Sequence, residues 1–311
     1  MRIVFMGTPE FSVPCLERLI SDGEEVVGVF TQPDKPKGRG YELAFSPVKE
    51  CALKHNIPVF QPKSMKTGEA LEILEKLQAD LSIVVAYGKI LPKEILYAPK
   101  YNSINIHASL LPRYRGSAPI QWSILNGEKE TGVTSMLMDE GIDTGDMLLS
   151  DKVEITDNMT AGELHDKLSL MGAEVLSKTV KALKNGELKS EKQNDKLSCY
   201  APMLSKELCP VDFSKSAQEV HNQIRGLSPW PVATAVLDGK KIKIHSSVVS
   251  NCKSDAQSGK IVKTDNALTV VCGDGNCIDI TEIQLEGKKK MSVKDFLLGH
   301  KVDTGTIMER G

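Results

Sequence analysis

The sequence lacks the cysteine spacings that disulfide and zinc frameworks require. Seven cysteines are scattered over 311 residues, no two of them form a C-x-x-C pair, and no H-x-x-x-H motif accompanies them. Both kinds of framework depend on tight, repeated spacings. We therefore expect free, buried thiols in a reducing compartment and no metal site.

Long apolar runs are also missing. No apolar run approaches the length of roughly 18 residues that a membrane-spanning helix needs. The apolar start of the chain, Met1–Gly7, has one basic residue and is too short for the apolar region of a secretory signal. The sequence therefore predicts a protein without a membrane span, and the cytoplasm is its expected location.

The chain has no large excess of charge of either sign. Its 39 Lys and Arg and 41 Asp and Glu give a net charge of −2 at pH 7, which argues against nucleic-acid binding through overall charge. Local basic clusters can still contact phosphates. An apolar content of 41% and a charged content of 26% are typical of a globular protein. The length favours two domains.

The first part of the chain alternates strand-like and helix-like stretches. Leu81–Tyr87 is almost entirely apolar, as strands buried on both faces of a parallel sheet are. A long helix is expected after Thr160, which has capping-box spacing to Glu163, and Asn185-Gly186 should end it. This alternation predicts an α/β domain with a mostly parallel sheet and helices on both sides. The other expected strands are Arg2–Met6, Glu25–Thr31, Ser103–His107 and Gly132–Met138.

The character of the chain changes after residue 188. Residues 189–205 begin with a polar, charged stretch typical of a linker. A helix is expected over Ser216–Arg225, and beyond it alternating runs flank turns such as Asp238-Gly239, a strong hairpin signal. We therefore predict domains at 1–188 and 206–311, the second a small antiparallel barrel, for which OB-like barrels are one class. Its expected strands are Val232–Leu237, Lys241–Val249, Ala267–Cys272 and Cys277–Ile283.

Two polar residues stand out in the expected strand Ser103–His107. Asn105 and His107 are separated by one residue, so their side chains project from the same face. They lie at the carboxyl end of the strand, where open α/β sheets bind ligands. An amide beside an imidazole can bind the oxyanion of a tetrahedral intermediate. A lone strand histidine is more often structural, so the pair alone does not decide between the two roles.

An acidic turn follows the expected strand Gly132–Met138. The segment Met138–Asp146 has four carboxylates and two glycines, and it lacks the ligand spacing and closing glutamate of a calcium loop. A solvated turn and a carboxylate that lies against His107 and fixes its tautomer both remain open.

A nucleotide cofactor is not expected, because the first strand is followed by one glycine, Gly7, where the dinucleotide fingerprint has three.

Together these motifs resemble the 10-formyltetrahydrofolate-dependent formyltransferases. The pattern Asn-x-His-x-Ser-Leu-Leu-Pro at 105–112 is followed about thirty residues later by Asp-x-Gly-apolar-Asp-Thr-Gly at 139–145. The resemblance is greatest to the bacterial members that formylate methionine on initiator methionyl-tRNA. It extends through Phe30–Asp34, Pro58–Pro62, Val85–Gly88, Arg115–Gln121 and Ser228–Pro231.

The resemblance implies a Rossmann-like catalytic domain, a linker and an OB-like barrel domain that binds tRNA, in a monomer. It implies that Asn105, His107 and Asp143 are catalytic, with 10-formyltetrahydrofolate as co-substrate. The acceptor amine would attack the formyl carbon, with Asn105 and protonated His107 donating to the oxyanion and Asp143 acting as base through water. No metal is needed, because the formyl donor is already activated. The residues implied to contact the folate are Ser109, Leu110, Leu111 and Pro112.

A basic segment between the second strand and the next helix bears on the acceptor. Pro33–Tyr41 combines Lys35, Lys37 and Arg39 with two glycines and two prolines, which indicates a mobile basic loop. Charge alone favours a solvated connection, whereas the resemblance favours contact with the acceptor end of tRNA. Two further clusters could add phosphate contacts from the second domain, namely Lys240-Lys241-Lys243 and Lys288-Lys289-Lys290.

Four alternative functions remain at this point. Within the same chemistry, the acceptor could be a sugar nucleotide or another small amine, or the glycinamide of purine synthesis. The last is disfavoured, because that enzyme resembles a single domain and this chain carries about a hundred further residues. A hydrolase would release formate from the folate without an acceptor. A non-catalytic RNA-binding protein is disfavoured by the intact Asn105, His107 and Asp143.

Overall fold

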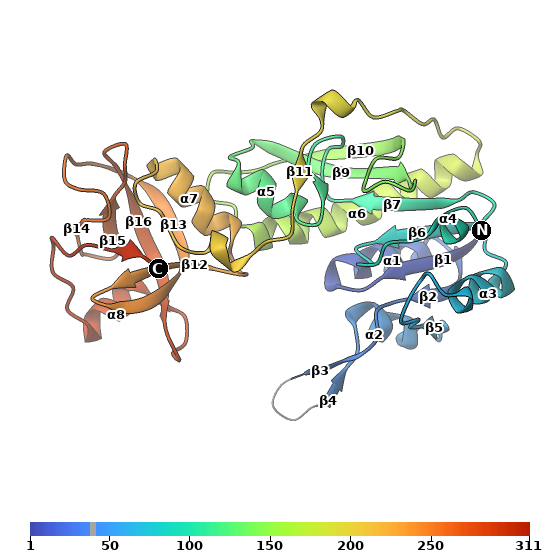
Figure 1. Ribbon diagram of the computed structural model, residues 1–311, viewed down its shortest axis with the longest axis horizontal. Helices are drawn as coiled ribbons and strands as arrows, with labels where there is room; N and C mark the ends of the chain where they lie inside the picture. The colour runs from blue at the N-terminus through green and yellow to red at the C-terminus, as the bar shows by residue number, and fades with distance from the viewer. Residues whose placement is uncertain (38–41) are drawn as a thin grey trace. The chain divides into compact units, whose positions relative to one another are not determined.

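The computed structural model describes residues 1–37 and 42–311, which form two compact units (Figure 1). Unit 1 comprises Met1–Gly116, Gly132–Val153 and His165–Tyr200, and unit 2 comprises Ser117–Thr131, Glu154–Leu164 and Ala201–Gly311. Each unit therefore gathers three separate segments, whereas the domains predicted from the sequence are continuous. The limits 1–188 and 206–311 stay a prediction.

Unit 1 is built on a seven-stranded sheet with the order β10-β9-β7-β6-β1-β2-β5. The strands from β7 to β5 pair in parallel, and β9 runs antiparallel to β7. The prediction of a mostly parallel, Rossmann-like sheet is confirmed. The strands are β1 (Arg2–Gly7), β2 (Glu25–Phe30), β5 (Val59–Phe60), β6 (Leu81–Val85), β7 (Ser103–His107), β9 (Glu130–Leu137) and β10 (Met147–Glu154).

Helices cover both faces of this sheet. On one face, Val4 of β1 and Val84 of β6 share a buried apolar cluster with Leu74 of α3. On the other face, a Cβ atom at Gly172 of α6 would lie 3.3 Å from Ile106 of β7, so helix and strand are in close contact. The helices are α1 (Val13–Ser21), α2 (Pro47–Lys54), α3 (Gly68–Leu77), α4 (Lys93–Leu96) and α6 (Ala161–Lys184).

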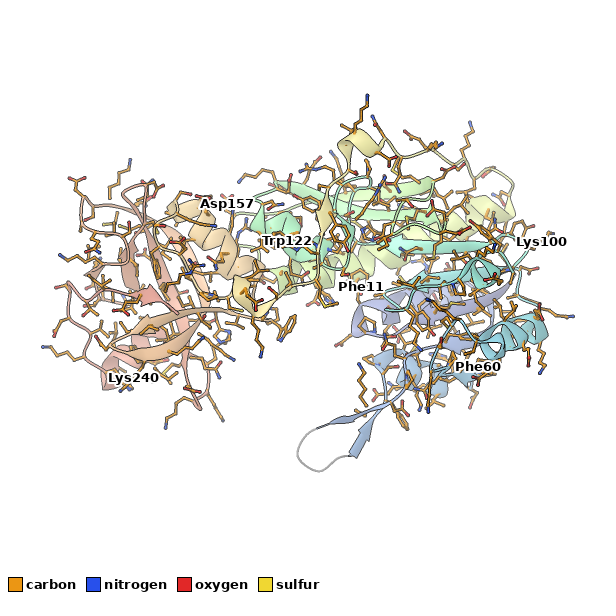
Figure 2. The ribbon with its side chains drawn as sticks, in the orientation of Figure 1. Phe11, Phe60, Lys100, Trp122, Asp157 and Lys240 are labelled. Atoms are coloured by element: carbon orange, nitrogen blue, oxygen red, sulfur yellow. The ribbon has the colours of Figure 1, made fainter. Side chains whose placement is uncertain are left out.

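The edge of the sheet and the start of α6 illustrate how local sequence sets these elements. The Phe30 ring comes from β2 and the Phe60 ring from β5, and the two rings pack with their centroids 5.3 Å apart. Phe60 is labelled in Figure 2. At α6, the Glu163 backbone N–H donates to Thr160 Oγ1 at 3.2 Å, and the Thr160 N–H donates to the Glu163 carboxylate at 2.8 Å. The predicted capping box is therefore confirmed. The helix ends at Lys184, as the Asn185-Gly186 signal predicted.

The basic segment is a ribbon over part of its length. Strands β3 (Lys35–Lys37) and β4 (Glu42–Ala44) pair antiparallel, with Lys35 opposite Ala44. The prediction of a basic loop over Pro33–Tyr41 is therefore wrong for Lys35–Lys37, because main-chain pairing with β4 gives these residues strand structure that their Gly- and Pro-rich context did not indicate. Arg39 lies outside the described residues.

Unit 2 contains a curled antiparallel sheet with the order β14-β15-β16-β13-β12-β18, to which β17 adds on β16. Residues 305–308 bond to residues 259–261 through the backbone, at 2.7–2.8 Å, so that the end of the chain lies along the β14 side. The sheet thus forms a half-barrel, which confirms the antiparallel barrel-like prediction. The strands are β12 (Ala233–Leu237), β13 (Lys240–Lys253), β14 (Ile261–Lys263), β15 (Leu268–Val271), β16 (Asn276–Leu285), β17 (Met291–Ser292) and β18 (Glu309–Arg310).

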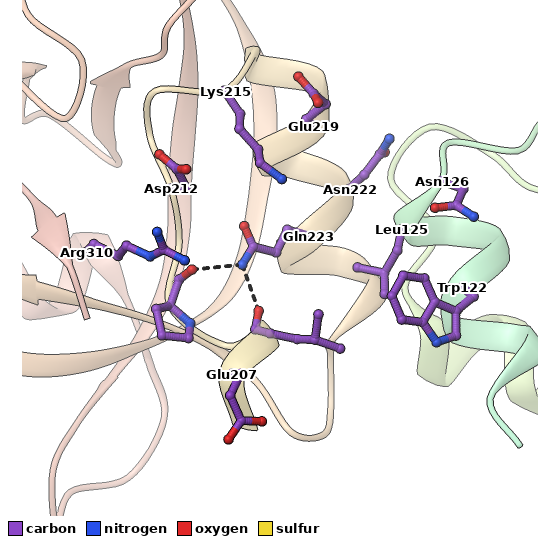
Figure 3. A pocket seen from close by; sticks show the side chains of 12 residues that line it. Trp122, Leu125, Asn126, Glu207, Asp212, Lys215, Glu219, Asn222, Gln223 and Arg310 are labelled. Atoms are coloured by element: carbon purple, nitrogen blue, oxygen red, sulfur yellow. Dashed lines mark hydrogen bonds between the residues drawn. The ribbon is translucent and has the colours of Figure 1, made fainter. Parts of the chain in front are cut away.

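The helices of unit 2 are α5 (Pro119–Leu125), α7 (Ala217–Gly226) and α8 (Val293–Gly299). Helix α7 begins with a capping box between Ser216 and Glu219. Trp122 of α5 and Gln223 of α7 both line one cavity (Figure 3). The short remaining elements are β8 (Arg115–Gly116), β11 (Tyr200–Ala201) and the 3-10 turns η1 (Glu10–Ser12), η2 (Asp195–Leu197) and η3 (Lys206–Leu208).

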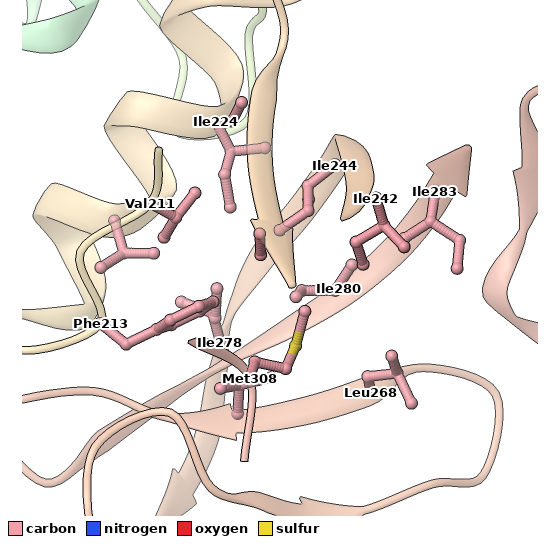
Figure 4. Packing of buried hydrophobic residues seen from close by; sticks show 14 of the residues in the cluster. Val211, Phe213, Ile224, Ile242, Ile244, Leu268, Ile278, Ile280, Ile283 and Met308 are labelled. Atoms are coloured by element: carbon pink, nitrogen blue, oxygen red, sulfur yellow. The ribbon is translucent and has the colours of Figure 1, made fainter. Parts of the chain in front are cut away.

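The core of unit 2 lies between α7 and the concave face of the half-barrel. Ile224 of α7 belongs to the same buried cluster as Ile242 and Ile244 of β13 and Ile280 and Ile283 of β16 (Figure 4). These isoleucines are fully buried, and each contributes about 1.5–3 kcal/mol relative to an exposed side chain.

Over residues 1–37 and 42–311, no helix has both the length and the apolar character that crossing a membrane requires.

Candidate active site

Asn105 and His107 project from one face of β7, as predicted. Their side chains are nearly buried, with 9% and 6% of the residue exposed. Ile106 between them points to the opposite face, where it meets α6. Strand β7 lies between the parallel strand β6 and the antiparallel strand β9, so the pair stands inside the sheet rather than at its edge.

The structure brings Asp143 to this pair. Asn105 Nδ2 donates to Asp143 Oδ1 at 3.4 Å, and His107 Nδ1 lies 3.7 Å from Asp143 Oδ2. The backbone N–H of Gly116 donates to the same Oδ2 at 2.8 Å. An amide, an imidazole and a carboxylate therefore converge at the end of β7, as a site for proton transfer and oxyanion binding requires.

The second ring nitrogen of His107 fixes the orientation of the imidazole. His107 Nε2 lies 2.9 Å from the carbonyl oxygen of Tyr114. A carbonyl oxygen only accepts hydrogen bonds, so Nε2 carries the proton that is donated. Nδ1 is then the nitrogen that faces Asp143 and is able to take part in chemistry.

The acidic turn has a shape that depends on its glycines. Asp139 accepts hydrogen bonds from the Gly141 N–H at 3.0 Å and from Thr144 Oγ1 at 2.6 Å, so its carboxylate holds the turn together. A Cβ atom at Gly145 would lie 1.7 Å from the carbonyl oxygen of Leu137, which no side chain tolerates. Asp143 itself has a φ of 54°, in the left-handed region. The turn thus presents Asp143 in a conformation that its surroundings must hold.

The four residues expected to contact the folate continue directly from β7. Ser109 is fully buried, and its Oγ donates to the carbonyl oxygen of Arg113 at 2.6 Å. Thr134 of β9, opposite His107, donates to the Ser109 carbonyl at 2.7 Å and accepts from the Leu111 N–H at 3.2 Å. The Ser109 hydroxyl is therefore used to shape the turn, while Leu110 and Pro112 are partly exposed.

Sequence reasoning missed several groups that hold this site. The Tyr114 carbonyl and the Gly116 N–H contact His107 and Asp143 through the backbone, which no side-chain pattern reveals. Gln193 donates to the carbonyl oxygens of Asp143 and Gly145 at 2.8 and 2.7 Å. It lies in the stretch interpreted as a linker, and one glutamine in a polar stretch gives no signal by itself.

The predicted tRNA-binding residues are described only in part. Lys35 is exposed and lines a cavity of about 290 Å³ with Phe45 and Gln32. Lys37 lies in β3 and Arg39 is outside the described residues. At the base of this ribbon, Lys49 donates to Asp34 at 2.5 Å and lowers the pKa of that carboxyl. This ion pair therefore holds the start of the ribbon against α2.

A larger cavity, of about 610 Å³, lies in unit 2 (Figure 3). In its wall, Gln223 Nε2 donates to the carbonyl oxygens of Leu208 and Pro210 at 2.8 and 3.1 Å. The residues predicted to be catalytic, to contact folate or to bind tRNA do not line this cavity. Among the described residues, no cluster of His, Cys, Asp and Glu could hold a metal ion.

Comparison with known proteins places this geometry in context. Residues 1–180 match the family model described as formyl transferase, and residues 203–301 match that described as formyl transferase, C-terminal domain. The methionyl-tRNA formyltransferase of Alkaliphilus oremlandii is 51% identical over 308 residues, which cover 99% of both chains. That of Clostridium perfringens strain 13 is 52% identical over 310 residues, 99% of this chain and all of the relative.

Solved structures share the fold at lower identity. An N-formyltransferase from Helicobacter canadensis, in complex with folinic acid and dTDP-3-aminofucose, superposes with a TM-score of 0.68. Its sequence is 24% identical, and the match covers 89% of this chain and 98% of that one. This likeness concerns the fold alone.

Proposed function

The chain belongs to the formyl transferase family, and we propose that it transfers the formyl group of 10-formyltetrahydrofolate to the α-amine of methionine on initiator methionyl-tRNA. The observation that carries this proposal is the convergence of Asn105, His107 and Asp143, in a chain about half identical to methionyl-tRNA formyltransferases over its whole length. The product, N-formylmethionyl-tRNA, starts translation.

The three side chains have separate roles in the transfer. The amine attacks the formyl carbon, the carbonyl oxygen becomes an oxyanion, and the bond from carbon to N10 of the folate breaks. Asn105 Nδ2 and protonated His107 Nδ1 donate to the oxyanion. The amine loses a proton to Asp143 through water, and the protonated Asp143 returns a proton through water to N10 as it leaves, so the site ends in its starting protonation state. His107 acts through Nδ1, because its Nε2 is bonded to Tyr114.

The folate lies against the turn that follows β7. Leu110 and Pro112 offer partly exposed apolar surface directly after the catalytic strand, which suits the flat pterin and aminobenzoyl rings. Ser109 and Leu111 keep this turn in place through Thr134. Residues 109–112 thus hold the formyl group next to His107.

Basic side chains bind the tRNA from two parts of the chain. Lys35 and Lys37 of β3, together with Arg39 of the same basic segment, contact the acceptor end. In unit 2, the β13–β16 register pairs Lys243 with Gln284, so Lys240–Lys243 at the start of β13 and Lys288–Lys290 after β16 lie at the same end of the half-barrel. Such clusters contact phosphates although the whole chain is slightly acidic.

The proposal extends to organisation and location. Residues 1–188 form the catalytic domain, residues 189–205 connect the domains, and residues 206–311 bind tRNA. The protein acts as a monomer in the cytoplasm.

One assay tests the reaction and its acceptor together. Formyl transfer from 10-formyltetrahydrofolate is measured with charged initiator tRNA, uncharged initiator tRNA, free methionine and an amino sugar nucleotide. Transfer to charged tRNA alone supports the proposal. Transfer to the amino sugar, or formate release with no acceptor present, would identify a small-amine transferase or a hydrolase instead.

A further inference from the structure

A single buried glutamine bridges two segments of the candidate active site. Gln193 lies between α6 and β11, and only 7% of it is exposed. Its Nε2 donates to the carbonyl oxygens of Asp143 at 2.8 Å and Gly145 at 2.7 Å. Its Oε1 accepts a hydrogen bond from Arg115 Nε at 3.0 Å. Both ends of the amide are therefore used, and all three bonds reach residues of the site or its direct neighbours.

The stretch that carries Gln193 is itself fixed at both ends. Glu191 and Met147 exchange two backbone hydrogen bonds of 2.8 Å. Near the other end, the carbonyl oxygen of Cys199 accepts from the Arg115 N–H at 3.0 Å, and its Sγ accepts from the Tyr114 N–H at 3.2 Å. We call residues 191–199 the strap. Within the strap, the side chain of Gln193 contacts the acidic turn.

Gln193 Oε1 bonds to Arg115, which belongs to a segment whose backbone contacts two catalytic side chains. The Tyr114 carbonyl accepts the hydrogen bond from His107 Nε2, and the Gly116 N–H donates to Asp143 Oδ2. Arg115 lies between these two residues. Gln193 therefore ties the backbone of the Asp143 turn to the segment that orients both His107 and Asp143.

We propose that Gln193 is a positioning residue for formyl transfer, which fixes the Asp143 turn against Tyr114–Gly116 so that the carboxylate stays on Asn105 and His107. This inference rests on the proposed function. It assigns a specific task to a stretch that the sequence suggested was only a linker.

The geometry of the turn explains why such a tie is needed. Asp143 has a φ of 54°, in the left-handed region, which costs free energy for residues with a Cβ atom although aspartate enters it more readily than most. Its contacts to Asn105 and His107, at 3.4 and 3.7 Å, are already long. A small displacement of the turn would lose both, and misplacement of reacting groups is costly in rate.

The chemistry of the three bonds requires an amide. Two acceptors, the carbonyls of Asp143 and Gly145, lie on one side, and a donor, Arg115 Nε, lies on the other. Gln193→Glu keeps an oxygen that accepts from Arg115. It places a carboxylate oxygen where the amide nitrogen donates to the two carbonyl oxygens. Methionine keeps the size of the side chain but makes none of the bonds. These two substitutions therefore separate the bonds to the turn from the filling of space.

The test compares Gln193→Met and Gln193→Glu with Lys192→Ala, an exposed neighbour on the same strap. Both Gln193 variants should lose roughly 10- to 100-fold in kcat, while the KM values for charged tRNA and folate change less than about twofold. The control should match the wild type. Near-normal kcat in a folded Gln193→Glu variant would overturn the inference, since only the bonds to the turn are lost there.

A double-mutant cycle with Asp143→Asn separates positioning from general stability. If Gln193 acts through the Asp143 carboxylate, Gln193→Met should cost little further rate once that carboxylate is gone. An equal loss in both backgrounds would mean that Gln193 acts elsewhere, and the inference would be wrong. The wild-type assay keeps the two proposals apart, because an inactive wild type would contradict the proposed function itself.

Discussion

His107 Nε2 donates to the carbonyl oxygen of Tyr114 at 2.9 Å, which leaves Nδ1 on the side of Asp143. Nε2 thus orients the imidazole, and Nδ1 is the nitrogen that can take part in proton transfer. In a His107→Gln variant the amide is able to replace the bond to Tyr114 but offers nothing in place of Nδ1. We expect kcat to fall by about 100-fold, with a melting temperature closer to the wild type than that of His107→Ala. Near-normal kcat in His107→Gln would show that Nδ1 is not needed.

The folate assignment predicts a KM effect without a kcat effect of similar size. Leu110 is partly exposed beside the catalytic strand, so Leu110→Ala should remove apolar contact with the folate rather than disturb a core. We expect the KM for 10-formyltetrahydrofolate to rise by about 5- to 10-fold, in line with the loss of a few methyl groups of contact. A co-crystal structure with a folate analogue bound away from residues 109–112 would rule the assignment out.

The basic ribbon predicts a salt-dependent effect on tRNA alone. Each phosphate contact contributes roughly 0.7–0.9 to the slope of log K against log salt. Lys35→Ala and Arg39→Ala should each raise the KM for charged tRNA, reduce that slope and leave the KM for folate unchanged. Lys54→Ala, on exposed surface of α2, is the matched control. Unaltered tRNA kinetics in Lys35→Ala and Arg39→Ala at low and high salt would remove the support for tRNA contact by this segment.

A buried histidine in unit 2 predicts how stability depends on pH. His221 Nε2 donates to the carbonyl oxygen of Asp157 at 2.9 Å, and Nδ1 lies 3.0 Å from Ser247 Oγ. Burial lowers the pKa of His221; the hydrogen bond to the Asp157 backbone opposes this, and the charge of Arg225 adds to the lowering. A lowered pKa means that the unfolded chain binds the proton more readily.

The contribution of neutral His221 to the free energy of unfolding is therefore fully present above its ordinary pKa of about 6.5. It is lost as the pH falls from there through the lowered pKa of the folded protein. We expect the free energy of unfolding to be lower at pH 5 than at pH 7, because the unfolded chain binds a proton at this histidine below about pH 6.5. In His221→Gln, which keeps a donor for Asp157 and does not titrate, the drop should be shallower. Denaturant unfolding at both pH values measures this, and equal drops in the two proteins would contradict it.

The parts of the fold that the sequence predicted are those with strong local patterns. Strand β7 was expected over Ser103–His107 and is found there, because alternating polar and apolar residues set its two faces. The capping signal of α6 was equally local. Strand β10 was not expected, since its residues Met147–Glu154 are mixed and partly exposed, as at the edge of a sheet.

The site shows the same division between local and distant causes. Asn105 and His107 were placed on one face by strand geometry, whereas the place of the acidic turn stayed open until the family resemblance implied that Asp143 acts with them. Gln193 could not be found in this way, since its role arises from hydrogen bonds to residues about fifty positions away in the chain. Such contacts are set by the tertiary fold and leave no periodic pattern in the sequence.

The central claim is that Asn105, His107 and Asp143 act together in formyl transfer to initiator methionyl-tRNA. The most direct measurement is the rate of transfer, at saturating concentrations of both substrates, for the three single alanine variants and the triple variant. We predict that each single change costs about 100-fold or more and that the triple variant loses little beyond the worst single one. A folded single variant with a near-normal rate, or losses that multiply in the triple variant, would contradict the account.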